Sequence, residues 1–324
     1  MIPAFPFQND LYEESGMAGT EYIRIVEVGP RDGLQNLATF VATDRKIGLI
    51  RELAACGLRE IQIGGFVHPQ AIPQFRDIRE VAAGVNGLEG VALTALVPNL
   101  RGARVAAACG LRKLNFFFSV SRSHNRSNVR QTPEESLAAL KTIREELFPS
   151  GIEIRVDLAT AFGCPFEGHI PIGAVLRAVE ETANLGIREI TLCDTVGFGN
   201  PRLVEEIARV CRERFPDVAF GMHFHNTRGL GLANTFAAYQ VGIRTFDASL
   251  GGLGGCPFAP GASGNTATED TAFLFAEMGV ETGVDLPALL ETARRLQGIL
   301  PDIPLTSALS RAGLPRRAGF PCPS

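Results

Sequence analysis

The chain has 324 residues, enough for one large domain or two ordinary ones. Apolar residues make up 45% of it and charged residues only 20%, a balance that excludes an intrinsically disordered chain. The formal charge of −4 offers no broad basic surface for a phosphate backbone. We therefore expect a globular protein of enzyme size that has no nucleic acid among its partners.

The seven cysteines are odd in number and lack C-x-x-C spacing, so they indicate neither a disulfide framework nor a structural zinc site. No apolar run reaches the length of a membrane span. The first twenty residues carry three carboxylates and neither lysine nor arginine, unlike a secretory or mitochondrial leader. These features predict a cytoplasmic protein without membrane contact.

Eight short apolar or β-branched runs recur along the chain, and several are apolar almost throughout, as parallel strands covered on both faces are. The runs begin at Tyr22, Glu60, Val91, Lys113, Glu153, Glu189, Val218 and Thr245. The starts lie roughly 20 to 40 residues apart, which suits one strand, one helix and two loops each.

Amphipathic segments with helical periodicity lie between these runs. They include Asp44–Cys56, Pro133–Leu147, Ile172–Leu185, Arg202–Arg214 and Leu230–Val241. Glycines that we interpret as helix stops are Gly57, Gly110, Gly186 and Gly242.

This alternation predicts a single (β/α)₈ TIM barrel with short N- and C-terminal extensions. We place an irregular N-terminal extension at residues 1–20, the barrel with an added C-terminal helix at 21–304, and an Arg/Pro-rich C-terminal tail at 305–324. Two separate α/β domains would also alternate strand and helix, but no Pro/Ser linker or charge run divides the chain.

Polar residues follow the first predicted strand, at the end where TIM barrels carry their chemistry. The segment G-P-R-D-G-L-Q-N puts Arg31, Asp32 and the amide of Gln35 in a tight Gly/Pro turn. A solvated turn with an Arg–Asp pair explains this segment, taken alone, equally well.

The seventh strand ends in H-F-H-N, so His223 and His225 point to the same side of it. Two imidazoles on one face make half a metal site, whereas a single strand histidine is more often structural. Asp194, at the end of the sixth strand, could ligate a metal, orient a histidine or cap the next helix. An Asp, two His and an amide oxygen suit Mg²⁺ or Mn²⁺ better than Zn²⁺.

A glycine-rich loop, Gly251–Asn265, follows the eighth strand. Such a loop serves as a mobile lid or lets the backbone approach a ligand, for example a phosphate. Cys256 could donate or accept a proton there, or it could be a small buried apolar residue. Asn265 immediately precedes a helix that we expect to start at Thr266, where its amide oxygen could cap that helix or reach a metal.

The chain resembles the 3-hydroxy-3-methylglutaryl-CoA lyases from about residue 22 to about residue 290. The resemblance rests on E-V-G-P-R-D-G-L-Q-N (27–36), G-C-P-F-E-G (163–168), D-T-V-G-F-G (194–199), H-F-H-N-T (223–227) and G-L-G-G-C-P-F-A-P-G-A-S-G-N-T-A-T-E-D (252–270). It implies a (β/α)₈ barrel and a metal-dependent enzyme that breaks or forms carbon–carbon bonds next to a carbonyl.

The resemblance also implies roles for individual residues. Asp32, His223, His225 and Asn265 would bind one divalent cation, Mg²⁺ or Mn²⁺. Arg31 would stabilise the developing enolate, and Cys256 would handle a proton. Either Asp32 or His223 would take the proton of the substrate hydroxyl, and the sequence does not choose between them.

The expected reaction is retro-Claisen cleavage of 3-hydroxy-3-methylglutaryl-CoA, or a close analogue, to acetyl-CoA and acetoacetate. We expect the partners to be a small acyl-CoA or hydroxy acid and a second copy of the chain in a homodimer. Substrate contacts are expected from Gln35, Gln62, His124 and Asp194.

Some positions depart from the family pattern. Gln62 stands where the family usually has Glu, and Leu37-Ala38 replaces the usual Glu-Lys. The segment after the fourth strand carries Arg122, His124 and Arg126, which could form a different anion clamp. The metal site is therefore a firmer prediction than the substrate.

Other functions remain open. The chain could act on another 3-hydroxyacyl-CoA or on a free hydroxy acid, or run in the condensing direction. A metal-dependent hydrolase with an H-x-H motif would carry that motif after the first strand, where this chain has Arg31-Asp32. Loss of turnover in a ligand-binding relative is conceivable because of Gln62, but all four proposed ligands and Cys256 are retained.

Overall fold

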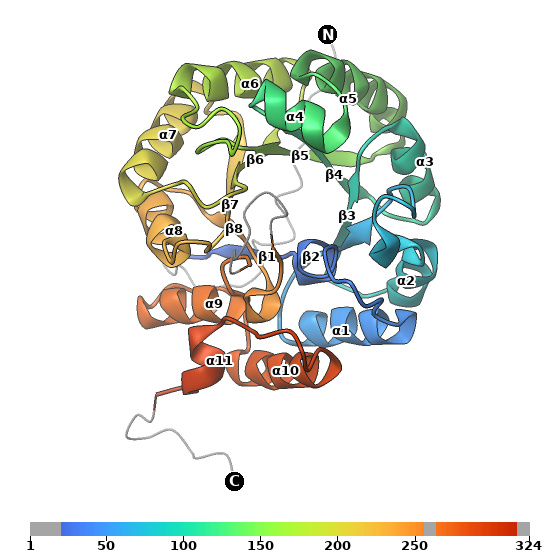
Figure 1. Ribbon diagram of the computed structural model, residues 1–324, viewed down its shortest axis with the longest axis vertical. Helices are drawn as coiled ribbons and strands as arrows, with labels where there is room; N and C mark the ends of the chain where they lie inside the picture. Colours follow the sequence, from blue (N-terminus) through green and yellow to red (C-terminus); the bar gives the residue numbers. More distant parts are fainter. Residues whose placement is uncertain (1–20, 256–263, 316–324) are drawn as a thin grey trace.

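The computed structural model describes residues 21–255 and 264–315, which form a closed barrel of eight parallel strands (Figure 1). The strands are β1 Arg24–Glu27, β2 Glu60–Gly65, β3 Ala92–Val97, β4 Lys113–Ser119, β5 Glu153–Ala159, β6 Glu189–Asp194, β7 Ala219–Phe224 and β8 Thr245–Ala248. Each strand pairs with the next, and β1 closes the ring against β8. The (β/α)₈ barrel predicted from the sequence is therefore confirmed, with every strand starting within two residues of its predicted position.

Helices surround the barrel, as Figure 1 shows in the view along its axis. They are α1 Thr43–Ala55, α2 Ile78–Val85, α3 Leu100–Ala108, α4 Arg122–Val129, α5 Pro133–Leu147, α6 Ile172–Asn184, α7 Pro201–Arg214, α8 Gly231–Gln240, α9 Thr268–Glu277, α10 Leu286–Ile299 and α11 Ala308–Ala312. In the described part of the chain, none of the helices could cross a membrane by its length and apolar character.

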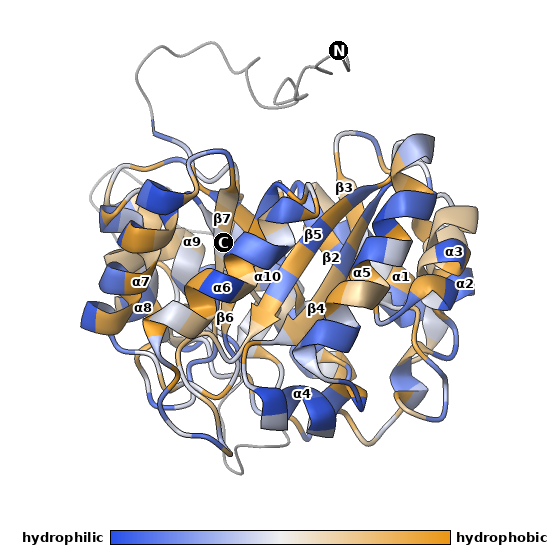
Figure 2. Ribbon diagram, turned by 90° about the horizontal axis from the view of Figure 1, so that it is seen from above, coloured by the Kyte–Doolittle hydropathy of each residue, from blue (hydrophilic) through white to orange (hydrophobic). Residues whose placement is uncertain are grey.

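The ring helices are amphipathic, and Figure 2 shows hydrophilic and hydrophobic residues on different faces of α6 and α7. In α7 the buried positions are Val204, Ile207, Ala208 and Cys211, the spacing of one helix face. Gly57, after α1, has a φ of 93°, and a Cβ there would lie 2.0 Å from the backbone oxygen of Gly283. Only glycine fits this conformation and this contact, which explains the helix stop.

The hydrophobic core lies between the strands and the helices, while the barrel lumen is polar. On β4, Leu114, Phe116 and Phe118 are buried toward the helices, whereas the alternate residues face the lumen. The amino-terminal end of the lumen is closed by an ion cluster. It consists of Arg24, Glu60, Lys113 and Glu189, with N–O distances of 2.7 to 3.2 Å.

Part of the segment that the sequence assigned to the C-terminal tail is folded against the barrel. Asp270, on α9, accepts hydrogen bonds from the Ser307 hydroxyl (2.9 Å) and from the backbone N–H groups of Ala308 (2.9 Å) and Leu309 (2.8 Å). The Thr306 N–H donates to the Gly251 carbonyl at 2.8 Å. Helix α11 and the residues before it are thereby tied to α9 and to the segment after β8.

Candidate metal centre and active site

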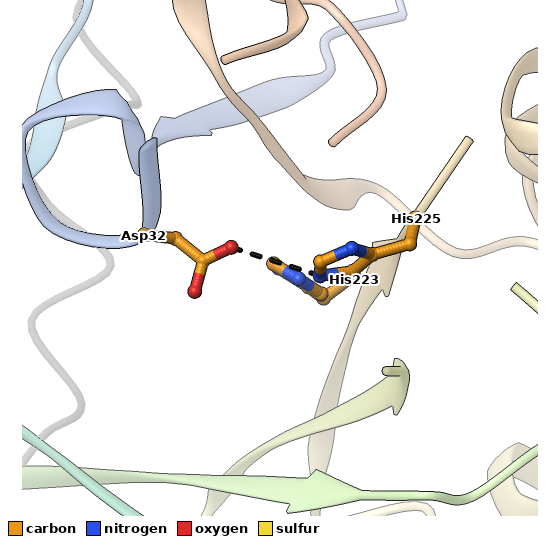
Figure 3. A group of neighbouring side chains, drawn as sticks. All are labelled: Asp32, His223 and His225. Carbon is orange, nitrogen blue, oxygen red and sulfur yellow. Dashed lines mark ion pairs between the residues drawn. The ribbon is translucent and has the colours of Figure 1, made fainter. Parts of the chain in front are cut away.

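Three residues with metal-binding side chains meet at the carboxyl ends of the strands (Figure 3). Asp32 follows β1, His223 lies on β7 and His225 follows that strand. One ligand atom from each lies within 4.8 Å of those of the other two, and all three residues are buried. The structure thus brings the predicted Asp and the two predicted His together at one point.

Local backbone geometry positions Asp32. Residues Gly29–Gly33 form a single π-helical turn, η1, in which the N–H groups of Arg31, Asp32 and Gly33 all donate to the Val28 carbonyl. The tight turn expected from the glycines and proline is therefore a helical turn. It places the side chains of Arg31 and Asp32 next to each other at the mouth of the barrel.

The two histidines share a face of β7, as the alternation of strand side chains predicts, and their ring centres are 5.1 Å apart. His225 forms an antiparallel bridge with Asn265, which brings the segment after β8 beside β7. The Asn265 amide group donates to Asp32 Oδ2 (2.8 Å) and to the Leu253 carbonyl (3.1 Å). All four predicted ligands therefore lie together.

The helix expected to start at Thr266 starts at Thr268, and Ala267 is its N-cap residue. Asn265 therefore does not cap it. The reason is tertiary, because Asn265 and Ala267 form β-bridges with His225 and Ser249, which keeps this segment extended.

The charge states suit a cation. Burial opposes ionisation of Asp32, but the neighbouring Arg31 guanidinium, and then His223 and His225, lower its pKa to about 2. Burial and the adjacent His223 lower the pKa of His225 to about 4, so that its imidazole is neutral at neutral pH. His223 Nδ1 lies 3.2 Å from Asp247 Oδ2, which leaves Nε2 available as a ligand.

A buried polar atom of this group supports a bound ion. Asn265 Oδ1 has no hydrogen-bond partner among residues 21–255 and 264–315. Buried polar atoms are normally satisfied, so atoms of this kind indicate water or an ion. One carboxylate, one amide oxygen and two imidazoles fit a divalent cation that accepts mixed oxygen and nitrogen ligands.

Arg31 lies beside this group and is held by two side chains. One guanidinium nitrogen pairs with Asp32, and Nε donates to Gln62 Oε1 at 2.7 Å. Gln35, half-buried at the mouth, reaches Asp32 Oδ1 at 3.3 Å through its amide nitrogen. Two of the four expected substrate contacts, Gln35 and Gln62, are thus in direct contact with Arg31 or Asp32.

The other two lie on neighbouring loops and have structural partners. His124 is on α4, where Nδ1 lies 2.7 Å from the Ser119 hydroxyl and burial lowers its pKa to about 4. Asp194 accepts from the backbone N–H groups of Phe198 (2.8 Å) and Gly199 (2.9 Å), and burial raises its pKa to about 6. Asp194 does not cap the next helix, because Asn200 does so for α7.

Cys256 lies outside the described residues, so its proposed role rests on the sequence. Two glycines near the ends of its loop, Gly254 and Gly264, are explained by packing. A Cβ on Gly254 would lie 2.6 Å from the Asn265 amide nitrogen, and one on Gly264 would lie 1.9 Å from the Gly252 carbonyl. Several glycines of this loop therefore allow its two ends to pass close to each other and to Asn265.

The sequence did not identify three charged residues of the lumen. Arg155 and Asp157 share one face of β5, and Arg155 reaches Asp247 on β8 at 2.5 Å. The pattern E-I-R-V-D-L-A carried a signal, since charges at alternate positions of an otherwise apolar strand indicate a polar lumen.

The chain is similar to known proteins over most of its length. The family profile described as HMGL-like matches residues 22–296. A hydroxymethylglutaryl-CoA lyase of Bacillus subtilis is 44% identical over 275 residues, 85% of this chain and 92% of that protein. An (R)-citramalyl-CoA lyase of Chloroflexus aurantiacus is 41% identical over 90% of this chain and 95% of its own length.

A solved structure adds a three-dimensional match. An HMG-CoA lyase of Acinetobacter baumannii, in complex with coenzyme A and 3-methylmalate, superposes with a TM-score of 0.87. It is 43% identical and covers 95% of this chain and 100% of that one.

Proposed function

The chain belongs to the HMGL-like family and is a carbon–carbon lyase of the hydroxymethylglutaryl-CoA lyase type, and on this basis we propose that it cleaves 3-hydroxy-3-methylglutaryl-CoA to acetyl-CoA and acetoacetate. The observation that carries the proposal is the convergence of Asp32, His223 and His225 beside Arg31 at the barrel mouth. Relatives named as hydroxymethylglutaryl-CoA lyases, including the one from Bacillus subtilis, support the choice of substrate.

Asp32, His223, His225 and Asn265 would hold one divalent cation. Mg²⁺ or Mn²⁺ is the better candidate, because the ligands are oxygens and imidazoles and the group contains no thiolate. When bound, such an ion orients a hydroxyl group and lowers its pKa.

Arg31 would stabilise the enolate oxygen that appears when the C2–C3 bond breaks. Its guanidinium is fixed by Gln62 and Asp32 before substrate arrives, so little reorganisation is needed. Arg31 is only 8% exposed, and a charge in such a dry site interacts strongly with developing negative charge. Protonation of the enolate carbon is assigned to Cys256 from the family resemblance.

Gln62 favours a second candidate within the same class. A neutral amide holds Arg31 where the family usually has a carboxylate, which changes the charge next to the reacting atoms. The Chloroflexus relative is named for another acyl-CoA. Cleavage of a different 3-hydroxyacyl-CoA is therefore the main alternative. A free hydroxy acid as substrate, or a reaction in the condensing direction, ranks below it.

A thioester panel tests these proposals. Protein stripped with EDTA would be assayed on CoA thioesters of 3-hydroxy-3-methylglutarate, citramalate and 3-methylmalate, and on the free acids, before and after addition of Mg²⁺ or Mn²⁺. We expect metal-dependent cleavage that is fastest for 3-hydroxy-3-methylglutaryl-CoA. The product to follow is acetyl-CoA for the first two thioesters and propionyl-CoA for the third. Faster cleavage of another thioester would favour the second candidate, and equal inactivity on all thioesters would contradict both.

We also propose a homodimer in the cytoplasm with a small acyl-CoA as the binding partner. The five cysteines of the described residues are free thiols, which supports a reducing compartment. Light scattering of the purified protein tests the dimer.

A further inference from the structure

Asp157 is a buried carboxylate on the lumen face of β5. It shares that face with Arg155, whose guanidinium crosses the lumen to Asp247. Because Asp157 comes two residues after Arg155, it lies one step nearer the mouth of the barrel. Its neighbours in register are Phe117 on β4 and Thr191 on β6. Phe117 is partly exposed, so the lumen is open to solvent or ligand at this level.

The two oxygens of this carboxylate differ in their hydrogen bonds. Oδ1 accepts from Arg155 Nε at 2.7 Å, whereas Oδ2 has no hydrogen-bond partner in the part of the chain that the structure describes. The residue is only 6% exposed. An unsatisfied buried carboxylate oxygen is costly, so a donor from water or from a ligand is expected there.

Asp157 is connected to the residues of the candidate metal centre. Burial raises its pKa, and the charges that act on it are Arg155, Asp247 and Arg31. Direct contacts link it to the candidate metal centre, because Arg155 bridges Asp157 and Asp247 Oδ2. That oxygen of Asp247 lies 3.2 Å from Nδ1 of His223.

The residues of the metal centre are already engaged. Asp32 pairs with Arg31 and accepts from Asn265, and His223 uses Nδ1 for Asp247. If both also ligate the ion, neither keeps a free atom for a substrate proton. Asp157 Oδ2 is buried, has no hydrogen-bond partner among the described residues and is not part of the ligand group.

Building on the function proposed above, we propose that Asp157 contacts the substrate and accepts the proton of its tertiary hydroxyl through Oδ2. The O–H bond breaks and the proton goes to the carboxylate. The C3–O bond becomes a carbonyl as the C2–C3 bond breaks, and the electron pair of that bond forms the thioester enolate. Protonation at C2 completes acetyl-CoA, and Asp157 returns its proton to solvent before the next turnover.

The variant Asp157→Asn tests this role. Asparagine has the same shape and keeps an oxygen for Arg155 Nε, but it cannot take up the proton. Thr191→Val is a matched control, because Thr191 is the neighbour in register on β6 and its buried hydroxyl also lacks a partner among the described residues. Both full-length proteins would be loaded with Mn²⁺ and compared with the wild type.

Two reactions separate a proton acceptor from a structural residue. Cleavage of the thioester needs a group that takes the hydroxyl proton. Exchange of the methyl hydrogens of acetyl-CoA with D₂O needs the enolate but no hydroxyl. We expect D157N to cleave roughly 10²- to 10⁴-fold more slowly than the wild type and to exchange at a rate close to the wild-type rate. T191V should retain both reactions and Mn²⁺ affinity.

The possible failures are distinguishable. Wild-type protein that cleaves none of the thioesters would contradict the proposed function, and the role of Asp157 with it. Active wild type with an equally active D157N would overturn the role of Asp157 alone. Joint loss of cleavage, exchange and Mn²⁺ affinity in D157N would also overturn it, because the residue would then act through the structure of the site.

Discussion

The Arg31 guanidinium is held by two side chains, and these contacts determine which residues could replace arginine. Nε is occupied by Gln62 and one terminal nitrogen by Asp32, which leaves the remaining N–H groups for a ligand. A lysine carries the same charge as a single ammonium group and cannot make this set of contacts. Substitutions of Arg31 can therefore distinguish the effect of its positive charge from the effect of its hydrogen-bond geometry.

The variant Arg31→Lys should lower kcat by roughly 10²- to 10³-fold, the usual effect of removing one fixed donor to a developing oxyanion. Arg31→Met, which removes the charge as well, should be slower still. Steady-state kinetics on the best thioester and titration with Mn²⁺ would measure both effects. Wild-type kcat in R31K would show that the guanidinium does not contact the enolate oxygen.

Single residues of the site differed in how far the sequence could identify them. Arg31 and Asp32 follow a predicted strand, the two histidines stand at the end of another, and all four belong to motifs. Their place at the mouth could therefore be predicted before their contacts were known. Asp157 stands in no such motif. Its partner Arg155 is paired with Asp247, and these two residues are 92 positions apart in the chain. Local pattern cannot reveal a pairing of that kind.

At the scale of elements, helix α11 is an anchor for the end of the described chain. Asp270 of α9 accepts hydrogen bonds from the backbone N–H groups of its first turn, and its own residue Leu309 is buried. A helix of five residues has little stability of its own, so these contacts keep it folded. The Thr306–Gly251 hydrogen bond connects it to the first residue of the glycine-rich loop.

The variant Asp270→Ala should destabilise the protein by about 1 to 2 kcal/mol, the usual cost of losing a helix cap with its hydrogen bonds. Urea denaturation measures this loss, and hydrogen exchange should show faster exchange at residues 305–312. Asp285→Ala is the control, because Asp285 caps α10 through Ala288 at 3.0 Å. Unchanged exchange of α11 in D270A would contradict the role of Asp270 as its anchor.

The hydrophobic periodicity of the sequence predicts which elements exist better than it predicts where each one starts and ends. The eight strands were predictable because each is an apolar run bounded by turn residues. The start of α9 was not predictable, because Asn265 and Ala267 form β-bridges with the residues that directly follow β7 and β8. Helix α11 was not predicted from the sequence for a related reason, because its stability comes from contacts with α9 and not from its own residues.

Across the whole molecule, buried carboxylates join parts of the barrel that are far apart in the sequence. Glu27 is fully buried at the end of β1 and accepts from the backbone N–H groups of Gly29 (2.7 Å) and Leu250 (2.9 Å) and from the Thr268 hydroxyl (2.7 Å). It therefore links β1 to the segment after β8 and to α9. Burial raises its pKa from 4.5 to about 7, although these hydrogen bonds favour the ionised form.

This shift predicts how stability depends on pH. The folded protein binds the Glu27 proton more tightly than the unfolded chain, so the contribution of Glu27 is fully present below pH 4.5 and is lost as pH rises through about 7. The variant Glu27→Gln stays neutral at every pH. Relative to the wild type, its unfolding free energy should therefore rise by about 3 kcal/mol between pH 4.5 and pH 8.

Urea denaturation of both proteins at pH 5 and pH 8 measures this difference. Other titrating groups are present in both proteins, so their effects cancel in the comparison. The buried Glu269 is an exception, because its charge contributes to the raised pKa of Glu27 and is therefore part of the measured difference. Glu153→Gln, at the exposed start of β5, controls for the general effect of removing a carboxylate. A difference between E27Q and wild type that is the same at both pH values would mean that Glu27 is already ionised in the folded barrel at pH 5, held by its three donors against the effect of burial.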